Sequence, residues 1–206
     1  MKIILVSNNE LSNNFYFEEE TNIETKKKFR PLSIEGEQQA KKLAKKDIFN
    51  NIERIYSDAS VSNIDSAKYL AEVLKQDVII NKRLHDIKIG DLKGKTVKML
   101  SFFQEHDFTF KLDGGESLND AGVRISSFIR NILNDSYENI VIYLPKRCIL
   151  AYLINHTSAE FNLDDRLVLS YNDEVILGNT DEAMDIFELT FEERELKKLA
   201  IIKEEV

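Results

Sequence analysis

The chain has 206 residues and a mass of 23.9 kDa, enough for one full-sized domain and too short for two large ones. Its hydrophobic content of 43% and charged content of 31% are ordinary for a folded protein and disfavour global disorder. The net charge of -8 disfavours nucleic acid and anionic membranes as partners, and the single cysteine excludes a disulfide framework. No apolar run approaches the span of a bilayer, so a cytoplasmic protein is expected.

The chain opens with a continuous apolar run, Lys2–Val6, which predicts a strand buried on both faces. The polar stretch 13–30, acidic at first and basic later, predicts a solvated loop. Ser33 then stands where it can cap a helix, because acidic residues follow in the first turn and apolar residues repeat behind it at helical spacing. These segments predict a strand, a loop and a helix, in that order.

The same alternation continues along the chain. Strands are predicted at 52–56, 78–80, 140–144 and 185–189, and helices along the apolar stripes 64–74, 118–132 and 149–154. Ser117 and Asp120 have the spacing of a capping box before the second of these helices, and an acidic, lysine-containing tail follows the last strand. The alternation predicts an α/β layered domain with a mostly parallel sheet, and no linker or repeat divides residues 1–206, which are expected to form a single domain.

In such a sheet, ligands bind in the crevice beyond the carboxyl ends of the strands. The segments expected to border this crevice are 7–10, 57–62, 83–94 and 144–147. This expectation concerns position and carries no chemistry by itself.

Five segments carry a more specific signal, and they span most of the chain in order. They are MKIILV with the polar turn behind it, PLSIEGEQQA, RIYSDASVSNIDSAKYLAEVL, RLHDIKIGDLKGKT and DGGESLNDAGVRISSFI. Together they resemble the motifs of the histidine phosphatase superfamily, the phosphoglycerate mutase-like proteins. The resemblance implies a three-layer sandwich, in which helices flank a mostly parallel central sheet. The short stretch between Gly94 and Gly114 is more similar to the compact phosphatases than to the longer mutases.

The resemblance also implies where the family's chemistry would lie. In the family, one histidine attacks phosphorus, two arginines and a second histidine stabilise the transferring group, and a carboxylic acid protonates the leaving oxygen. These positions fall on Ser7 and Ser62 for the arginines, Asn8 for the nucleophile, Pro145 for the second histidine and Asp86 for the acid. A slip of one residue would move the second arginine position from Ser62 to Asn63, which is also uncharged.

Of these positions, only Asp86 keeps a group suited to the reaction. The amide of Asn8 cannot form a stable phosphorylated intermediate, the ring of Pro145 offers no hydrogen-bond donor, and loss of a nucleophile typically costs on the order of a million-fold in rate. No catalytic residues are therefore expected, and the resemblance implies a pseudo-phosphatase with a binding or regulatory role. The alternatives are a phosphatase or other hydrolase of phosphate monoesters that uses Asp86 with a non-standard nucleophile such as His85, and a paralogue that has lost its function.

Positive charge is expected near the same crevice. Lys146 and Arg147 replace glycines of the family pattern at a predicted helix N-terminus, and with Asn14 they are the candidates for binding an anion. The alternative is that these two side chains are ordinary solvated cations on the surface and bind no anion.

Two kinds of partner are expected. One is a small phosphorylated or anionic ligand, and the other is a protein partner or a second copy of the chain. Neither nucleic acid nor a membrane is expected to bind.

The remaining reactive side chains are assigned structural roles. Cys148 follows the predicted helix start and is expected to pack in the interior rather than react. His85 is expected to point away from the crevice, and His106 and His156 are expected near helix ends. No set of side chains has a metal-ligand spacing, so neither a metal nor a cofactor is predicted.

Overall fold

The computed structural model describes residues 1–7, 10–13, 16, 18, 22–178 and 186–202. Its central sheet has six strands in the order β3-β2-β4-β1-β8-β9. The strands are β1 (Lys2–Val6), β2 (Arg54–Ser57), β3 (Val78–Ile80), β4 (Asn139–Tyr143), β8 (Ile186–Glu192) and β9 (Glu195–Ile202). The first four run parallel, whereas β8 and β9 are antiparallel to their neighbours. The predicted α/β fold with a mostly parallel central sheet is confirmed.

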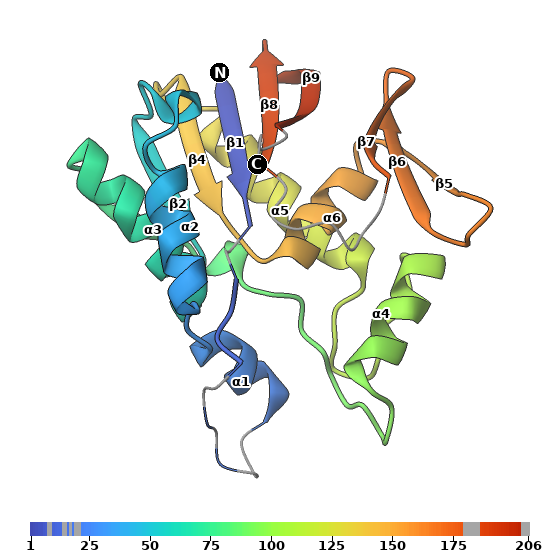
Figure 1. Cartoon of the computed structure of the whole chain (residues 1–206). Helices are drawn as coiled ribbons and strands as arrows, with labels where there is room; N and C mark the ends of the chain where they lie inside the picture. Colours follow the sequence, from blue (N-terminus) through green and yellow to red (C-terminus); the bar gives the residue numbers. More distant parts are fainter. Residues whose placement is uncertain (8–9, 14–15, 17, 19–21, 179–185, 203–206) are drawn as a thin grey trace.

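Helices cover both faces of this sheet (Figure 1). One face carries α2 (Ile34–Leu43) and α3 (Val61–Leu74), and the other carries α5 (Leu118–Ile132) and α6 (Lys146–Ile154). Outside these layers lie α1 (Ile23–Phe29), α4 (Val97–His106), the 3-10 turns Asp47–Phe49 and Lys82–Leu84, and a three-stranded sheet of β5 (Ser158–Phe161), β6 (Leu167–Tyr171) and β7 (Glu174–Leu177). Within the described part of the chain, no helix combines the length and apolar character needed to cross a membrane.

The central strands are apolar throughout because alternate side chains enter opposite layers. Ile3 and Leu5 belong to the core that includes α5 and α6, whereas Ile4 and Val6 belong to the core that includes α2 and α3. All four side chains are fully buried. β4, which pairs with β1, divides its side chains between the two cores in the same way. A strand with two buried faces therefore needs the uninterrupted apolar run that the sequence displays.

Local capping explains where two of the helices begin. The hydroxyl of Ser33 accepts a hydrogen bond from the backbone N–H of Gly36 at 2.9 Å. Before α5, Ser117 accepts from the N–H of Asp120 at 3.0 Å, and the Asp120 carboxylate accepts from the N–H of Ser117 at 3.2 Å, so the predicted capping box is confirmed. The last helix, α6, begins after Pro145, which provides no side-chain cap.

The structure differs from the sequence-based expectation in the stretch 13–30, where a loop was expected. Its second part forms α1, whose N-terminus is capped by the side chain of Asn22, which accepts from the N–H of Thr25 at 2.8 Å. A seven-residue helix has few apolar positions, and none of the residues of α1 is buried. The stretch therefore lacks the apolar stripe from which a helix is recognised.

The C-terminal third also contains more strands than expected. The sheet β5-β6-β7 was not foreseen, and the expected tail pairs with β8 as β9. The residues that join β6 to β7, Asn172 and Asp173, have φ of 50° and 66°, and those that join β8 to β9, Glu193 and Arg194, have φ of 50° and 69°. Two successive residues with positive φ match the short hairpin turns that glycine usually marks. Because neither turn contains glycine, the hairpins were missed.

Close packing of α5 on α6 yields a stability prediction. A Cβ atom at Gly122 would lie 2.3 Å from the carbonyl oxygen of Ala151, so Gly122→Ala must push the two helices apart. We expect the free energy of unfolding in urea to fall by about 1–3 kcal/mol, despite the higher helix propensity of alanine. Val123→Ala, at an exposed neighbour on α5, is the control and should stay within about 0.5 kcal/mol of wild type. A Gly122→Ala variant as stable as wild type would contradict this close contact.

Candidate functional site

Three parallel strands end at the same edge of the central sheet. Val6 of β1 and Ser57 of β2 both lie opposite Tyr143 of β4. Beyond these pairs, the N–H of Leu144 donates to the carbonyl of Val6 at 3.1 Å, and the N–H of Asp58 donates to the carbonyl of Tyr143 at 3.3 Å. The residues that leave β1, β2 and β4 therefore lie side by side, at the edge where the crevice was expected.

Most positions that the resemblance assigned to the reaction lie in segments that leave this edge. Ser7 follows β1 and is 2% exposed, and Ser62 lies in the first turn of α3 and is 4% exposed. Pro145 is the N-cap residue of α6. Asn63, the position after a one-residue slip, is fully buried. The nucleophile position, Asn8, lies outside the described residues. Ser7, Ser62, Asn63 and Pro145 carry no charge and no imidazole.

A buried carboxyl group, Asp58, lies at the same edge. Its Oδ1 atom accepts hydrogen bonds from the hydroxyl of Ser60 and from Nδ2 of Asn63, each at 2.8 Å. Burial raises the pKa of Asp58 above its usual value, and the charge of Asp86 adds to this effect, while the two hydrogen bonds oppose it. The side-chain oxygen of Asn63 is buried without a hydrogen-bond partner among the described residues. The edge thus holds a carboxyl group that sequence analysis did not single out.

The acid position, Asp86, is held by contacts within the protein. One carboxylate oxygen forms an ion pair with the ammonium group of Lys27 on α1, and the other accepts from the N–H of Ile87 at 2.8 Å. A second contact joins the same two segments, because Glu24 of α1 accepts from the N–H of Ile89 at 2.8 Å. Helix α1 is therefore docked onto the loop that carries Asp86, and both carboxylate oxygens of Asp86 have partners.

Arg124 of α5 fixes the rest of this loop. Its guanidinium donates to the carbonyl oxygens of Arg83 and His85 at 2.7 and 3.1 Å and pairs with Glu116 at 2.9 Å. Although burial opposes ionisation of Glu116, the hydrogen bond from Arg124 lowers the pKa of this carboxyl below its ordinary value. The Nδ1 atom of His85 lies 2.6 Å from the backbone oxygen of Asp86, not against its carboxylate. The structure does not join His85 and the Asp86 carboxylate into an acid–base pair.

Cys148 lies in the first turn of α6 and is fully buried. Burial raises the pKa of its thiol well above the usual range, and the charge of Asp86 acts in the same direction. The sulfur donates to the carbonyl oxygen of His85 at 3.3 Å. The thiol is therefore neutral at physiological pH, and its expected role as a packing residue is confirmed.

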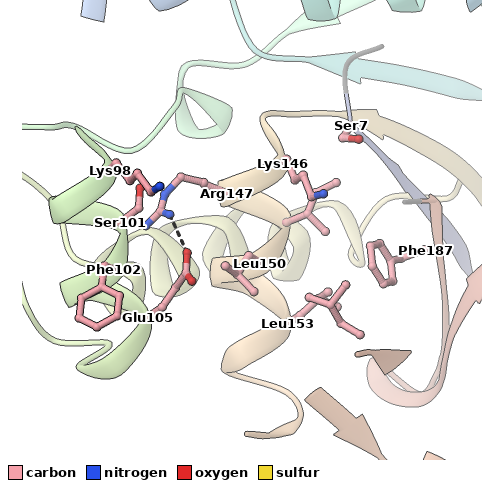
Figure 2. A pocket seen from close by; sticks show the side chains of 12 residues that line it. Ser7, Lys98, Ser101, Phe102, Glu105, Lys146, Arg147, Leu150, Leu153 and Phe187 are labelled. Carbon is pink, nitrogen blue, oxygen red and sulfur yellow. Dashed lines mark hydrogen bonds and ion pairs between the residues drawn. The ribbon is translucent and has the colours of Figure 1, made fainter. Parts of the chain in front are cut away.

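A cavity of about 380 Å³ opens beside this edge of the sheet (Figure 2). Its lining residues are Ser7, Lys98, Ser101, Phe102, Glu105, Lys146, Arg147, Ile149, Leu150, Leu153, Leu177 and Phe187. Two of the three predicted anion-binding residues, Lys146 and Arg147, thus face a cavity together with Lys98 of α4. The third, Asn14, lies outside the described residues.

The guanidinium of Arg147 is held against α4. It donates to the carboxylate of Glu105 at 3.1 Å and to the side-chain oxygen of Gln104 at 2.9 Å. Gln104 is 1% exposed and donates in turn to the carbonyl of Glu116 at 2.8 Å. This chain of contacts fixes the cavity wall and offsets part of the charge of Arg147. Sequence analysis missed the contribution of α4, although Thr96, which accepts from the N–H of Met99 at 3.2 Å, is a recognisable helix cap.

Metal binding finds no support in the part of the chain that the structure describes. No group of three or more His, Cys, Asp or Glu side chains within it could hold a metal ion.

Two of the histidines lie near helix ends. His106 is the last residue of α4, and its Nε2 atom is 3.2 Å from the carboxylate of Asp165. His156 follows α6, and its Nε2 atom is 3.1 Å from the hydroxyl of Ser126. Both imidazoles therefore contact neighbouring side chains near helix ends, as expected.

A sequence profile of the Histidine phosphatase superfamily (branch 1) matches residues 19–182, more than half of the chain. Ser62, Asp86 and Pro145 lie inside the matched span, whereas Ser7 and Asn8 precede it. No curated protein sequence matches the chain.

Solved structures share the fold. One is the complex of mycobacterial glucosyl-3-phosphoglycerate phosphatase with inorganic phosphate, with 15% identity and a TM-score of 0.68 over 98% of this chain and 95% of that one. Another is a putative alpha-ribazole-5'-P phosphatase from Escherichia coli, with 13% identity and a TM-score of 0.62 over 99% and 96% of the two chains. The alpha-ribazole phosphatase from Shigella flexneri has 16% identity and a TM-score of 0.61 over 100% of both chains. At these identities the likeness establishes the fold.

The buried carboxyl of Asp58 makes stability depend on pH. Its pKa is raised in the folded protein above the value of about 3.9 in an unfolded chain, so the folded state binds this proton more tightly. This tighter binding of the proton adds to the free energy of unfolding. The contribution is fully present below about pH 3.9 and is lost as the pH rises through the pKa that Asp58 has in the folded protein. Asp58→Asn abolishes the titration and keeps an oxygen for Ser60 and Asn63. We expect the free energy of unfolding of the variant, minus that of wild type, to rise between about pH 4 and pH 7.

Urea denaturation at a series of pH values measures this difference. Because the other titrating groups are common to both proteins, their contributions cancel in the comparison. A difference that stays constant over the whole range would show that Asp58 titrates in the folded protein as it does in the unfolded chain.

Proposed function

Because the chain belongs to the histidine phosphatase superfamily (branch 1), we propose that it is a pseudo-phosphatase, which binds a small anion without forming a phosphohistidine. The observation that carries the proposal is Pro145 at the N-cap of α6, where the resemblance places the second histidine. A proline ring cannot donate a hydrogen bond to a phosphoryl oxygen or exchange a proton with it. Binding, with a regulatory role through a partner protein, is the function that such a site retains.

The other reaction positions support the same proposal. Ser7 and Ser62 are small, uncharged and almost fully buried, so they supply no cation to the end of β1 or to the start of α3. Asp86, the one retained acid, has both carboxylate oxygens engaged, one of them by Lys27. The side chain of Asn8 is an amide, and an amide nitrogen does not act as a nucleophile toward phosphorus.

The arrangement of charge around α6 favours an anionic ligand. Lys146 and Arg147 occupy the first turn of this helix, which contains no acidic residue. The positive end of the helix dipole disfavours each cation there by about 0.3–1 kcal/mol, because the last turn is the favourable place for positive charge. An anion in the cavity would interact with both side chains and with the helix dipole, so it would offset this unfavourable placement. The chain as a whole has a net charge of -8, which makes this local excess of cations more distinctive.

A second candidate is an active phosphatase that uses Asp86 and a non-standard nucleophile. It is favoured by the two carboxyl groups at this edge of the sheet, Asp86 and the buried Asp58, because a pair of carboxyl groups with different environments is a common arrangement for acid–base chemistry. Its reaction would require Asp86 to leave Lys27. The alternative is testable without knowledge of the natural substrate.

Turnover distinguishes the two candidates. With p-nitrophenyl phosphate and a panel of phosphate monoesters, we expect no release of phosphate above the rate in buffer, and the same background for Asp86→Ala. Activity that disappears in Asp86→Ala, or an acid-labile phosphorylated form of the protein, would establish the active phosphatase instead.

Binding of phosphate tests the proposed role directly. At about ten times its Kd, phosphate should stabilise the folded protein by about 1.4 kcal/mol and raise the melting temperature by about 3–5 °C. Lys146→Ala should reduce this shift, because it removes a cation from the cavity wall. Lys45→Ala is the matched control, since Lys45 is an exposed lysine that does not line the cavity. A melting temperature that saturating phosphate leaves unchanged in wild type would refute the anion site.

A further inference from the structure

A second cavity, of about 340 Å³, lies between α5, the end of α6 and the hairpin of β8 and β9. Because β8 runs antiparallel to β1, its residue Phe191 lies beside Met1, to whose carbonyl the N–H of Phe191 donates at 2.8 Å. The second cavity therefore lies toward the start of β1, whereas the candidate functional site lies at its end. The two cavities have no described lining residue in common. The second cavity is lined by Val123, Ser126, Ile129, Arg130, Leu133, Tyr152, Asn155, His156, Phe191, Arg194 and Leu196.

The polar lining of the second cavity is positively charged. Arg130, in the last turn of α5, and Arg194, in the turn between β8 and β9, supply one guanidinium each, and no acidic residue is among the described lining residues. Glu193, which precedes Arg194, does not line the cavity. Within the described residues, neither guanidinium is joined to a carboxylate, and the carboxylate of Glu195 is paired with Lys197 instead, at 2.6 Å. The cavity therefore attracts an anion.

His156 belongs to the same lining and responds to this charge. Its Nε2 atom is 3.1 Å from the hydroxyl of Ser126, and its ring lies against that of Tyr152, with centroids 4.4 Å apart. Burial lowers the pKa of His156 below its ordinary value, and the positive charge of Arg130 lowers it further. The imidazole is therefore uncharged at physiological pH. An anion bound beside Arg130 would oppose the second of these effects, so the titration of His156 reports whether the cavity is occupied.

The ends of two helices favour an anion with a single charge. Leu133 follows α5 and Asn155 follows α6, and both residues line the second cavity. The C-terminal end of a helix carries a partial negative charge of about half an elementary charge. Two such ends offset part of the charge of the two guanidinium groups, which disfavours a doubly charged phosphate group. A carboxylate has one charge, and its two oxygens match the planar fork of a guanidinium.

The rest of the lining is apolar. Ile129 and Leu133 on one side and Phe191 of β8 on another are buried, and Val123 lies at the rim with 52% of its surface exposed. A volume of about 340 Å³ is at the small end of the range for small-molecule sites and too small for a folded partner. An inorganic anion would leave the apolar wall uncovered. The lining therefore suits a carboxylate that is attached to a compact apolar group.

We propose that the second cavity is a binding site for a small organic carboxylate with a compact apolar group. The carboxylate binds between Arg130 and Arg194, and the apolar group packs against Leu133 and Phe191. The inference goes beyond the function proposed above and does not depend on it, because the site has its own lining residues at the other end of the sheet.

Three probes separate the two parts of such a ligand. Hydrocinnamate has a carboxylate and a phenyl ring, its primary amide has nearly the same shape without the charge, and acetate has the charge without the ring. Binding is followed by NMR on the ring protons of His156. We expect hydrocinnamate to bind at least ~10-fold more tightly than either of the other two. Saturation with hydrocinnamate should also raise the pKa of His156, because the carboxylate opposes the charge of Arg130.

Variants with matched controls assign the two contacts. Arg130→Gln and Arg194→Gln should each weaken hydrocinnamate by ~5-fold or more, whereas Arg166→Gln, at an exposed arginine outside the cavity, should not. Val123→Ala should weaken hydrocinnamate by ~3-fold, because it removes apolar surface at the rim. Its control is Val175→Ala, at a valine that is 60% exposed and does not line the cavity. Since all these residues are exposed, each variant should keep the melting temperature of wild type.

Each of the other outcomes overturns the inference. If the amide binds as tightly as hydrocinnamate, or if both arginine variants bind hydrocinnamate as wild type does, the guanidinium groups do not hold a carboxylate. If acetate matches hydrocinnamate, the apolar wall takes no part and the ligand class is wrong. If hydrocinnamate at about 20 mM leaves the ring protons of His156 unchanged, the cavity is not a carboxylate site. Phosphate binding tests the other cavity, so its failure would refute the proposed function and leave this inference standing.

Discussion

The pairing of β1 with β4 determines where Ser7 and Pro145, the residues that follow these two strands, lie in the site. Val6 stands opposite Tyr143, and the N–H of Leu144 continues the ladder to the carbonyl of Val6 at 3.1 Å. A slip of one residue would exchange the side chains of β1 between the two cores, so this register is fixed by burial on both faces. Pro145 is then held where α6 begins, and the first turn of α6 is held against the cavity. The position of the proline is thus a consequence of core packing.

The parts of the family's motifs that remain in this chain are those that hold backbone segments together. A Cβ atom at Gly36 would lie 2.1 Å from the carbonyl oxygen of Glu10, and one at Gly115 would lie 2.7 Å from that of Ile89. Gly36, in the first turn of α2, and Gly115, before α5, both permit a close approach of two backbone segments. On the function proposed here, the chain has lost the reactive groups of the family and kept its architecture.

Features that depend on neighbouring residues were predictable, and features that depend on distant ones were not. The doubly buried strand Lys2–Val6 and the caps at Ser33 and Ser117 follow from local pattern, and the structure confirms them. The wall of the cavity depends on Arg147 meeting Glu105, 42 positions earlier in the chain, and no local pattern carries that contact. Likewise, Asp58 looks like an ordinary polar turn residue in the sequence. Its raised pKa arises from burial, which only the assembled layers create.

On the function proposed here, positive charge is displaced relative to the family pattern. The resemblance assigns the positions of the two arginines to Ser7 and Ser62, while Lys98, Lys146 and Arg147 line the cavity beside α4 and α6. Asp86 does not line that cavity, and its carboxylate is paired with Lys27. On the function proposed here, an anion bound by these lysines lies where cations attract it, and the one retained acid is engaged elsewhere. Transfer of a phosphoryl group needs the anion, the nucleophile and the acid at one point. On this proposal, separating them leaves a site suited to binding.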